Sequence, residues 1–480
     1  MINLKIRAQK KKIYLDILKM SNISAVRKFE IAPDNQTSGN TKYSYRQGNP
    51  IITFSIAPQE YYVRSKNLKL CFDVELKDSG NALPNNNDQD GTGEREVRLN
   101  NRVGVASLFQ QLEINNAMNQ NLETIRHYGR LLGSLLPSGS GWNEYTTYLS
   151  NEFGVSSNEQ VEGRYTNRKM SVAMPIMAGI FLQGADIPLS MNNGVGGLNL
   201  KFSLQASIQA LYGGTATTPN SYYEITNVAL MGEYAMPKGG ALPQISSYPF
   251  SGFSSFYSVI NNNDQTSQIN PALSAVVSTF TNFLPTPHIS NYAKDAMRTT
   301  PLLNRSQPVA QPDNYDLLAP ISKISFMRGG VLFPLQFQVD ENEVIVRNPA
   351  VANEFAGSSF DAQRQYYYAM SIRPRTSPAT DQLAGQNSEN LPTANGDTQH
   401  ECVTGSDINT TECGFQNVYG IGIRVGDMLG VGNTANFKQQ SYSTRIISKL
   451  NGSSPMSSYT FFLYRSVINY DDRGLVSIVN

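Results

Sequence analysis

The clearest pattern in the chain is an unbroken alternation of apolar and polar side chains over the eleven residues from Leu198 to Ile208. Only an extended backbone, with its period of two residues, keeps every second side chain on one face. The pattern therefore predicts a long β-strand with one buried face and one wet face. The apolar row is Leu198, Leu200, Phe202, Leu204, Ala206 and Ile208, and the polar row is Asn199, Lys201, Ser203, Gln205 and Ser207.

Similar strand patterns recur on both sides of this segment. Apolar residues alternate with Thr, Ser, Lys, Asp and Glu over Ile52–Ile56 and Leu68–Leu76. The chain from 261 to 320 is rich in Asn, Ser and Pro, and we expect at most short strands there. Two or three strands with a bend at Gly329–Gly330 are predicted over 321–346. Further strands are predicted at 169–183, 198–208, 222–236 with a kink near Asn227, 250–260, 418–425, 443–450, 459–470 and 475–479.

Two segments depart from the period of two. In the segment 105–136 the apolar positions recur with a roughly helical spacing, and Asn121 suits the N-cap of a helix. Those positions are Leu122, Ile125, Leu132 and Leu135. We expect a helical excursion here whose apolar face seals the end of a sheet. A second excursion is predicted over 351–368.

The eight residues from Met236 to Pro243 contain two prolines and two glycines and mark the best domain boundary. Each side of it carries roughly eight strand candidates without a βαβ rhythm. We predict an all-β protein of two tandem eight-stranded antiparallel jelly rolls, with short helical excursions and long surface loops. The expected divisions are a basic arm and lead-in at 1–40, a first roll at 41–236, a linker at 237–246, and a second roll at 247–480 with a long polar loop at 376–413.

The charge of the chain limits the classes of function that it can have. Charged residues make up 16% of the chain and the formal net charge is +1, so no global field gathers nucleic acid or steers an acidic substrate. The arm at 1–20 is locally basic, and its Lys10, Lys11 and Lys12 fit weak contact with nucleic acid or an internal membrane. A solvated tail and a natural start at Met20 are the alternatives. We expect no membrane-spanning helix and no signal peptide.

Recognisable chemistry is missing from the sequence. It contains no P-loop, no dinucleotide-binding glycine fingerprint, no HExxH motif and no GxSxG motif. The three histidines, His127, His288 and His400, lack the spacing of metal ligands. We therefore predict no catalytic residue, no cofactor-binding residue, no metal site and no enzyme activity.

Three clusters of side chains have both a structural and a functional interpretation. The acidic pairs at 341–343 and 471–472 fit turns between strands, although a glycosidase needs only two carboxylates about 5 to 10 Å apart. The tyrosines at 366–368 suit a core or a subunit interface better than stacking on sugars or bases. In each case the structural interpretation is favoured.

The three cysteines say little about compartment. Cys71 lies within a strand pattern and is expected to pack as an inert thiol. Cys402 and Cys413 lie eleven positions apart in a polar loop. A local disulfide and a pair of free thiols both stay open for them, and assembly inside a cell disfavours the disulfide.

Several segments carry a family resemblance through their order and spacing. They are 45–56, 68–76, 104–136, 187–205, 324–339 and 466–480. This series resembles the double jelly-roll major capsid proteins of the polinton-like virus and virophage group. In that family an apolar stretch is paired with an acidic residue and a short helix, and the corresponding places here are Glu113, Glu123, Tyr128 and Leu131. The chain is short for the group, and the start before Met20 matches nothing in it.

The resemblance implies a structural protein of a virion. It implies a homotrimer that forms pseudo-hexameric capsomers, contacts with neighbouring capsomers and with penton and minor capsid proteins, and assembly inside the host cell into an icosahedral shell around a DNA genome. Charge-poor, Tyr-rich surfaces suit such lateral contacts. The alternative is a secreted or surface β-sandwich adhesin or carbohydrate-binding protein, which usually carries a secretion signal. An enzyme built on a β-sandwich is the third hypothesis.

Overall fold

The computed structural model describes most of the chain between residues 23 and 479. The residues not described are 1–22, 39–40, 79–80, 83–97, 101–102, 140–149, 154–168, 183–184, 193, 213–220, 244, 246, 293–295, 298–320, 330, 339–368, 371–419, 425–433, 439, 449–454, 471–475 and 480. Several predictions fall there: the basic arm with Lys10 to Lys12, the helix at 351–368, the tyrosines at 366–368, the loop at 376–413, both acidic pairs, His400, Cys402 and Cys413.

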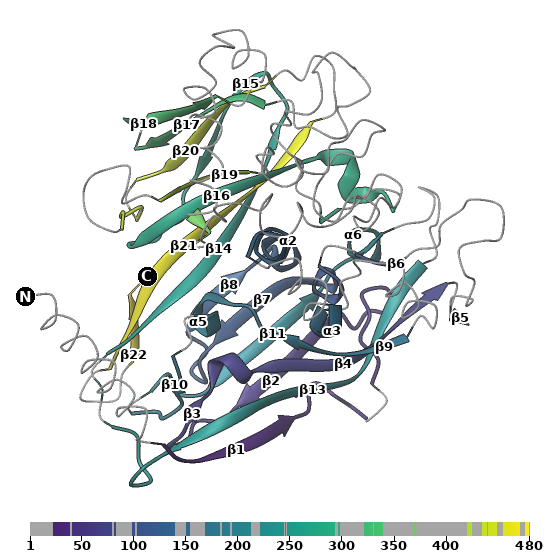
Figure 1. Ribbon diagram of the computed structural model, residues 1–480, viewed down its shortest axis with the longest axis vertical. Coiled ribbons are helices and arrows are strands. Elements are labelled where there is room, and N and C mark those ends of the chain that lie inside the picture. Colours follow the sequence, from purple (N-terminus) through teal and green to yellow (C-terminus); the bar gives the residue numbers. More distant parts are fainter. Residues whose placement is uncertain are drawn as a thin grey trace, which may run out of the picture.

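Strands from the first half of the chain form what we call the first sandwich (Figure 1). Its β13 sheet contains β1 (Ile23–Ile31), β3 (Tyr62–Val63), β4 (Lys69–Asp78), β5 (Asn81–Ala82), β9 (Lys169–Pro175), β10 (Ile187–Pro188) and β13 (Ser221–Pro237). Its β11 sheet has the order β2 (Ile51–Ile56), β11 (Leu198–Leu204), β7 (Phe109–Asn115) and β8 (Asn121–Ile125). A short ladder joins β6 (Arg98–Leu99) to β12 (Leu211–Tyr212). The pairings in these sheets are antiparallel.

Strands after residue 246 form the second sandwich. Its β21 sheet has the order β14 (Ser247–Ile260), β21 (Met456–Tyr470), β16 (Val276–Pro285) and β19 (Gly420–Arg424), with β22 (Val476–Val479) also paired to β21. Its β20 sheet has the order β15 (Asp264–Ile269), β20 (Tyr442–Ser448), β17 (Ile321–Arg328) and β18 (Val331–Gln338). No described sheet mixes strands from the two halves, and the exact domain boundaries stay a prediction.

The helices in the described part of the chain are short. They are α2 (Tyr128–Gly139), α3 (Ser150–Phe153), α5 (Gly179–Leu182) and α6 (Ser207–Ala210), with 3-10 turns η2 (Ser65–Asn67), η3 (Val105–Leu108) and η5 (Thr286–Ser290). No helix in the described part of the chain is long and apolar enough to cross a membrane.

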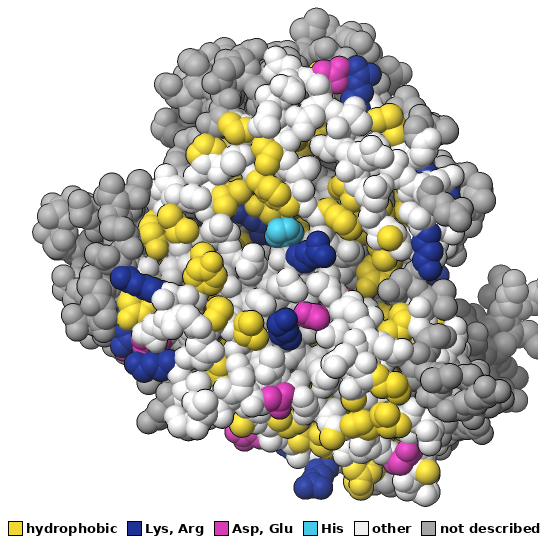
Figure 2. Space-filling view, turned by 180° about the vertical axis from the view of Figure 1, so that it is seen from behind, with side chains coloured by type: hydrophobic (Ala, Val, Ile, Leu, Met, Phe, Trp, Pro, Cys, Tyr) yellow, Lys and Arg dark blue, Asp and Glu magenta, His cyan; other side chains and the backbone are white. Residues whose placement is uncertain are grey.

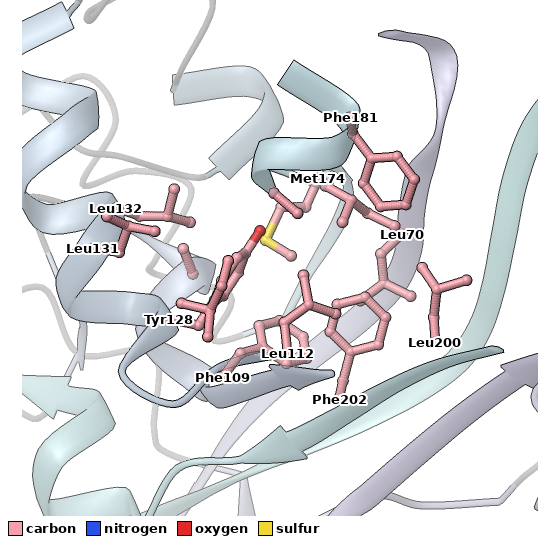
Figure 3. Close-up of a cluster of buried hydrophobic side chains, with 14 of the residues drawn as sticks. Leu70, Phe109, Leu112, Tyr128, Leu131, Leu132, Met174, Phe181, Leu200 and Phe202 are labelled. Atoms are coloured by element: carbon pink, nitrogen blue, oxygen red, sulfur yellow. The ribbon is translucent and has the colours of Figure 1, made fainter. Parts of the chain in front are cut away.

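The core of the first sandwich lies between its two sheets. Phe72 of β4 packs edge-on against Phe109 of β7, with ring centroids 5.7 Å apart, and Phe109 in turn contacts Phe202 of β11. Figure 3 shows Phe109 and Phe202 in one cluster with Met174 of β9 and Tyr128 of α2. Helix α2 therefore closes one end of the sandwich, as predicted for the helical excursion.

The strand that carries the clearest sequence pattern is confirmed but shorter than predicted. Its apolar side chains are buried and its polar side chains are half-buried, as the alternation predicts. β11 ends at Leu204, because Ser203 and Leu204 pair with Ile51 and Phe109, the first residues of the two neighbouring strands. Beyond that point no ladder remains to hold an extended chain, and the short helix α6 follows.

The predicted helix start at Asn121 is wrong. Asn121 begins β8, which forms a hairpin with β7 through a turn at 116–120 where Asn119 has a φ of 59°. The helix starts only at Tyr128. The helical spacing arose because Leu122 and Ile125 are buried on a strand while the later leucines are buried on a helix.

Two other strand predictions need correction. The Asn-rich segment 261–320 contains β16, which is ten residues long and central in its sheet. The bend predicted at Gly329 is a hairpin turn, where this residue has a φ of 55°, and it joins β17 to β18, two of the two or three strands expected over 321–346. The strand expected over 169–183 ends at Pro175, and α5 occupies part of the remainder.

The predicted lead-in at 1–40 contains a strand that the sequence analysis missed. β1 pairs with the C-terminal half of β13, from Ile31 opposite Leu230 to Ile23 opposite Pro237. Most of its side chains are exposed on both faces, so no alternation marks it in the sequence.

The kink predicted near Asn227 is confirmed. The register of β13 against β4 shifts between Thr226 and Ala229, and Asn227 adopts a φ of 51°. Its Nδ2 donates a hydrogen bond to Asp73 Oδ2 at 2.7 Å. Asn tolerates this left-handed conformation better than most residues do.

Changing Asn227 to Val is expected to destabilise the protein by about 1–2 kcal/mol relative to Asn227→Gly, because a β-branched residue is strained at positive φ. Both variants lose the hydrogen bond to Asp73, so the comparison isolates the backbone conformation. Thermal unfolding followed by circular dichroism measures the difference. Equal unfolding midpoints for the two variants would contradict the assignment of a bulge here.

Candidate functional site at the junction of the two sandwiches

The β21 sheet is buried on both faces. The side chains of β21 from Met456 to Tyr464 are all buried. Phe462 packs on Phe256 inside the second sandwich, whereas its neighbour Phe461 stacks on Phe280 and belongs to the core of the first sandwich. Figure 1 shows β14, β21 and β16 lying between the β20 sheet and helix α2 with strand β8. One sheet therefore serves two hydrophobic cores.

Glu123 of β8 lies at the centre of this junction. The residue is fully shielded from solvent. Its Oε1 accepts hydrogen bonds from the backbone N–H of Gly179 at 2.9 Å and of Phe253 at 2.7 Å, and its Oε2 accepts one from the N–H of Ile180 at 3.1 Å. The carboxylate thus ties β8 and α5 of the first sandwich to β14 of the second.

The electrostatics of Glu123 are set mainly by burial. Burial raises the pKa of Glu123 from its ordinary 4.5 to about 7, and the three backbone N–H groups oppose this shift. No cation is among the causes of the shift. When Glu123 is ionised, its three hydrogen bonds therefore recover less free energy than the loss of its hydration costs.

Side chains from the second sandwich close the open edge of β8. Ser255 Oγ accepts hydrogen bonds from the N–H of Arg126 at 3.0 Å and of His127 at 3.3 Å. The hydroxyl of Tyr464 donates to the carbonyl of Leu122 at 3.3 Å. An edge strand exposes backbone groups that invite further pairing, and here side chains satisfy them. We call these contacts, together with those of Glu123, the polar seam.

Two glycines allow the backbones at the seam to approach each other closely. A Cβ atom on Gly179 would lie 2.6 Å from the Cα of Gly252. A Cβ atom on Gly252 would lie 2.6 Å from the ring and hydroxyl of Tyr464. A larger side chain at Gly179 would force α5 away from β14, and one at Gly252 would displace the ring of Tyr464, which contacts β8.

Helix α2 completes the junction. Tyr128 Oη accepts a hydrogen bond from the N–H of Met177 at 3.0 Å, and Leu131 is fully buried. Gly129 and Gly133, one helical turn apart, pack against Met297 of the second half. The helix therefore contacts both sandwiches.

The structure brings together three of the four residues on which the family resemblance rests. Glu123, Tyr128 and Leu131 lie in or beside the junction. Glu113 lies elsewhere, on β7, where it pairs with Lys201 at 3.6 Å. Gly252 and Ser255 do not stand out in the sequence, although a glycine inside a strand pattern often marks a close approach of backbones.

Few of the histidines, cysteines and acidic pairs considered as functional residues lie in the described part of the chain. His127 lies at the junction, and His288 is buried on η5. Among the described residues, no group of three or more His, Cys, Asp or Glu side chains is placed to hold a metal ion. Cys71 is half-buried on β4, and burial raises the pKa of its thiol, which lowers its reactivity.

Changing Gly252 to Ala is expected to destabilise the protein by about 1–3 kcal/mol, because the added methyl group overlaps the Tyr464 ring. Ser254→Ala, a small change on the same strand, is the matched control and should have little effect. Urea unfolding followed by fluorescence measures both. A Gly252→Ala protein as stable as the control would contradict the close approach.

The pKa of Glu123 predicts a pH-dependent stability. The folded-state pKa lies above the ordinary value, so the folded protein holds the proton more tightly than the unfolded chain does. This contribution is fully present below about pH 4.5 and is lost as the pH rises to about 7, a change of about 3 kcal/mol.

Urea unfolding at several pH values, compared with Glu123→Gln, measures this contribution, because the other titrating groups cancel in the difference. The stability of the unaltered protein should fall relative to that of the variant as the pH rises from about 4.5 to 7. A difference that stays constant over this range would contradict the assigned pKa.

Comparison with known proteins finds similar solved structures. No family model and no curated protein matches the chain. Vp54 of the virus PBCV-1, in a crystal structure fitted into a reconstruction of the virophage Sputnik, is 10% identical, with a TM-score of 0.52 over 95% of this chain and 96% of that one.

Two further structures are similar over most of their length. A chain of the Sputnik virophage is 10% identical, with a TM-score of 0.53 over 95% of this chain and 88% of that one. The Faustovirus major capsid protein is 11% identical, with a TM-score of 0.53 over 93% of this chain and 90% of that one. At this level of identity the likeness concerns the fold. The chain has the double jelly-roll fold of these proteins, and its two sandwiches are the two rolls.

Proposed function

We propose that the protein is a viral major capsid protein. It forms homotrimers, the trimers form pseudo-hexameric capsomers, and the capsomers assemble with penton and minor capsid proteins into an icosahedral shell around a DNA genome. Its place is then the virion, after assembly inside the host cell, and its role is structural and not enzymatic. The single observation that carries the proposal is the likeness of nearly the whole chain to the Faustovirus major capsid protein and the virophage structures.

The junction supports this role on physical grounds. A capsid subunit built from two sandwiches keeps its shape only if the angle between the sandwiches is fixed. Here one sheet belongs to both cores, and the polar seam joins backbone to backbone through Glu123 and Ser255. Packed interiors deform little, so the two sandwiches behave as one rigid body.

The surface also suits lateral contact between subunits. The face in Figure 2 carries few charged side chains, scattered among apolar and uncharged polar ones. Protein interfaces are depleted in charged residues at their centres and enriched in Tyr and Met. The large apolar side chains that are exposed in the single chain include Val26, Tyr45, Ile51, Met118, Leu182, Met191, Met231 and Tyr257.

The basic arm is assigned a secondary role in this proposal. Lys10, Lys11 and Lys12 would make weak contact with nucleic acid or an internal membrane. These residues lie outside the described part of the chain, so their charge alone supports the assignment.

Purified full-length protein is expected to sediment as a trimer and to form capsomers with a hexagonal outline in negative-stain images. Gly252→Ala, which loosens the junction, should reduce capsomer formation, whereas Ser254→Ala should not. Analytical ultracentrifugation and imaging measure both properties. A stable monomer that binds a glycan array and never assembles would favour the adhesin alternative and contradict the proposal.

A further inference from the structure

A cavity of about 250 Å³ lies at the junction of the sandwiches, and its wall holds one permanent positive charge, Arg130. The guanidinium lies over the ring of Tyr459, 4.1 Å from the centroid. Its Nη2 is shielded from solvent without a hydrogen-bond partner, and no carboxylate among the described residues pairs with this side chain. A cation–π contact attracts the charge but does not neutralise it. The cavity therefore contains an uncompensated cation.

The other titratable groups in the wall do not supply the missing negative charge. Burial, with the neighbouring charges of Arg130 and Arg126, lowers the pKa of His127 to about 4, so its imidazole is neutral near pH 7. Tyr459 is protonated, because burial raises the pKa of its hydroxyl. None of the residues that line the cavity is acidic. The wall thus presents a single positive charge.

A single positive charge matches a carboxylate better than a phosphate. A phosphate group carries between one and two negative charges near neutral pH, and nucleic acids bind through several phosphates at once. Nη2 is closed off and the guanidinium also interacts with the hydroxyl of Tyr459, so a carboxylate would meet it through the nitrogens that these contacts leave. Arg and carboxylate groups form short, strong hydrogen bonds of this kind.

The remaining wall residues suit a polypeptide. Gln110 offers an amide donor and an amide acceptor, the pair of groups that a peptide backbone needs. Gln205 Nε2 donates a hydrogen bond to Gln209 Oε1, so these two amides offer only the capacity that their mutual bond leaves. Ile289 and Met297 add apolar surface against which the methylene groups of an acidic side chain can pack. Gln110 and Tyr257 are exposed, so the cavity is reached from outside.

We propose that this cavity binds the carboxylate of an acidic side chain from a neighbouring polypeptide, with Arg130 as its ion-pair partner. Recognition of the carboxylate stands on the cavity alone. That the polypeptide is another protein of the shell rests on the proposed function.

The test uses purified full-length protein and two end-blocked peptides, Gly-Ala-Glu-Ala-Gly and its counterpart with Gln at the centre. Saturation-transfer difference NMR measures weak binding of such peptides to a large protein. The Glu peptide is expected to bind about tenfold more tightly than the Gln peptide. Arg130→Gln should remove this difference, and Arg126→Gln, at an exposed arginine just before α2, should preserve it.

A second variant keeps the test decisive if Arg130→Gln folds poorly. Gln209→Glu adds a negative charge to the cavity wall and should also abolish the preference for the Glu peptide. Equal binding of both peptides by the unaltered protein, no binding of either, or displacement of the Glu peptide by inorganic phosphate at equal concentration overturns the proposal. Protein that fails to bind the peptide yet forms capsomers contradicts the cavity assignment and leaves the capsid role intact.

Discussion

The burial of the β21 sheet on both faces is the constraint on which the rest of the structure depends. A sheet with one wet face would leave the two sandwiches as separate bodies on a linker. Phe461 faces the core of the first sandwich, whereas Phe462 faces the core of the second. Separating the sandwiches would therefore expose apolar side chains at the contact surface of each sandwich. The chain therefore behaves as a single folded unit with two cores, although no described sheet crosses between its halves.

Apolar burial holds the sandwiches together, but it does not fix their relative position, since apolar contact is non-directional. The polar seam supplies the direction. Glu123 accepts hydrogen bonds from both sandwiches, and its desolvation makes any misalignment costly, because a buried carboxylate with fewer donors is less stable still. Hydrogen bonds that contribute little net stability can thus define one geometry among several that bury similar area.

The parts of the fold that the sequence predicts well are those in which burial follows the local period. The strands Ile51–Ile56, Lys69–Asp78 and Leu198–Leu204 alternate in sequence and in exposure. β16 was underestimated because it is buried on both sides and so shows no alternation. β1 was missed for another reason, since most of its side chains are exposed on both faces and only Phe29 and Ile31 pack against the core. Alternation reports a sheet with two different faces, and neither of these strands has them.

The functional site is hidden from the sequence by a different cause. Glu123 and Phe253 are joined by one hydrogen bond although 130 positions separate them. No spacing rule connects an acid on one strand to a backbone N–H on another, and the resemblance located Glu123 without giving its partner. A catalytic motif is readable because its residues must share one chemical geometry. A junction needs only that two surfaces fit, so its residues are unremarkable in type, and their role becomes visible only in the assembled fold.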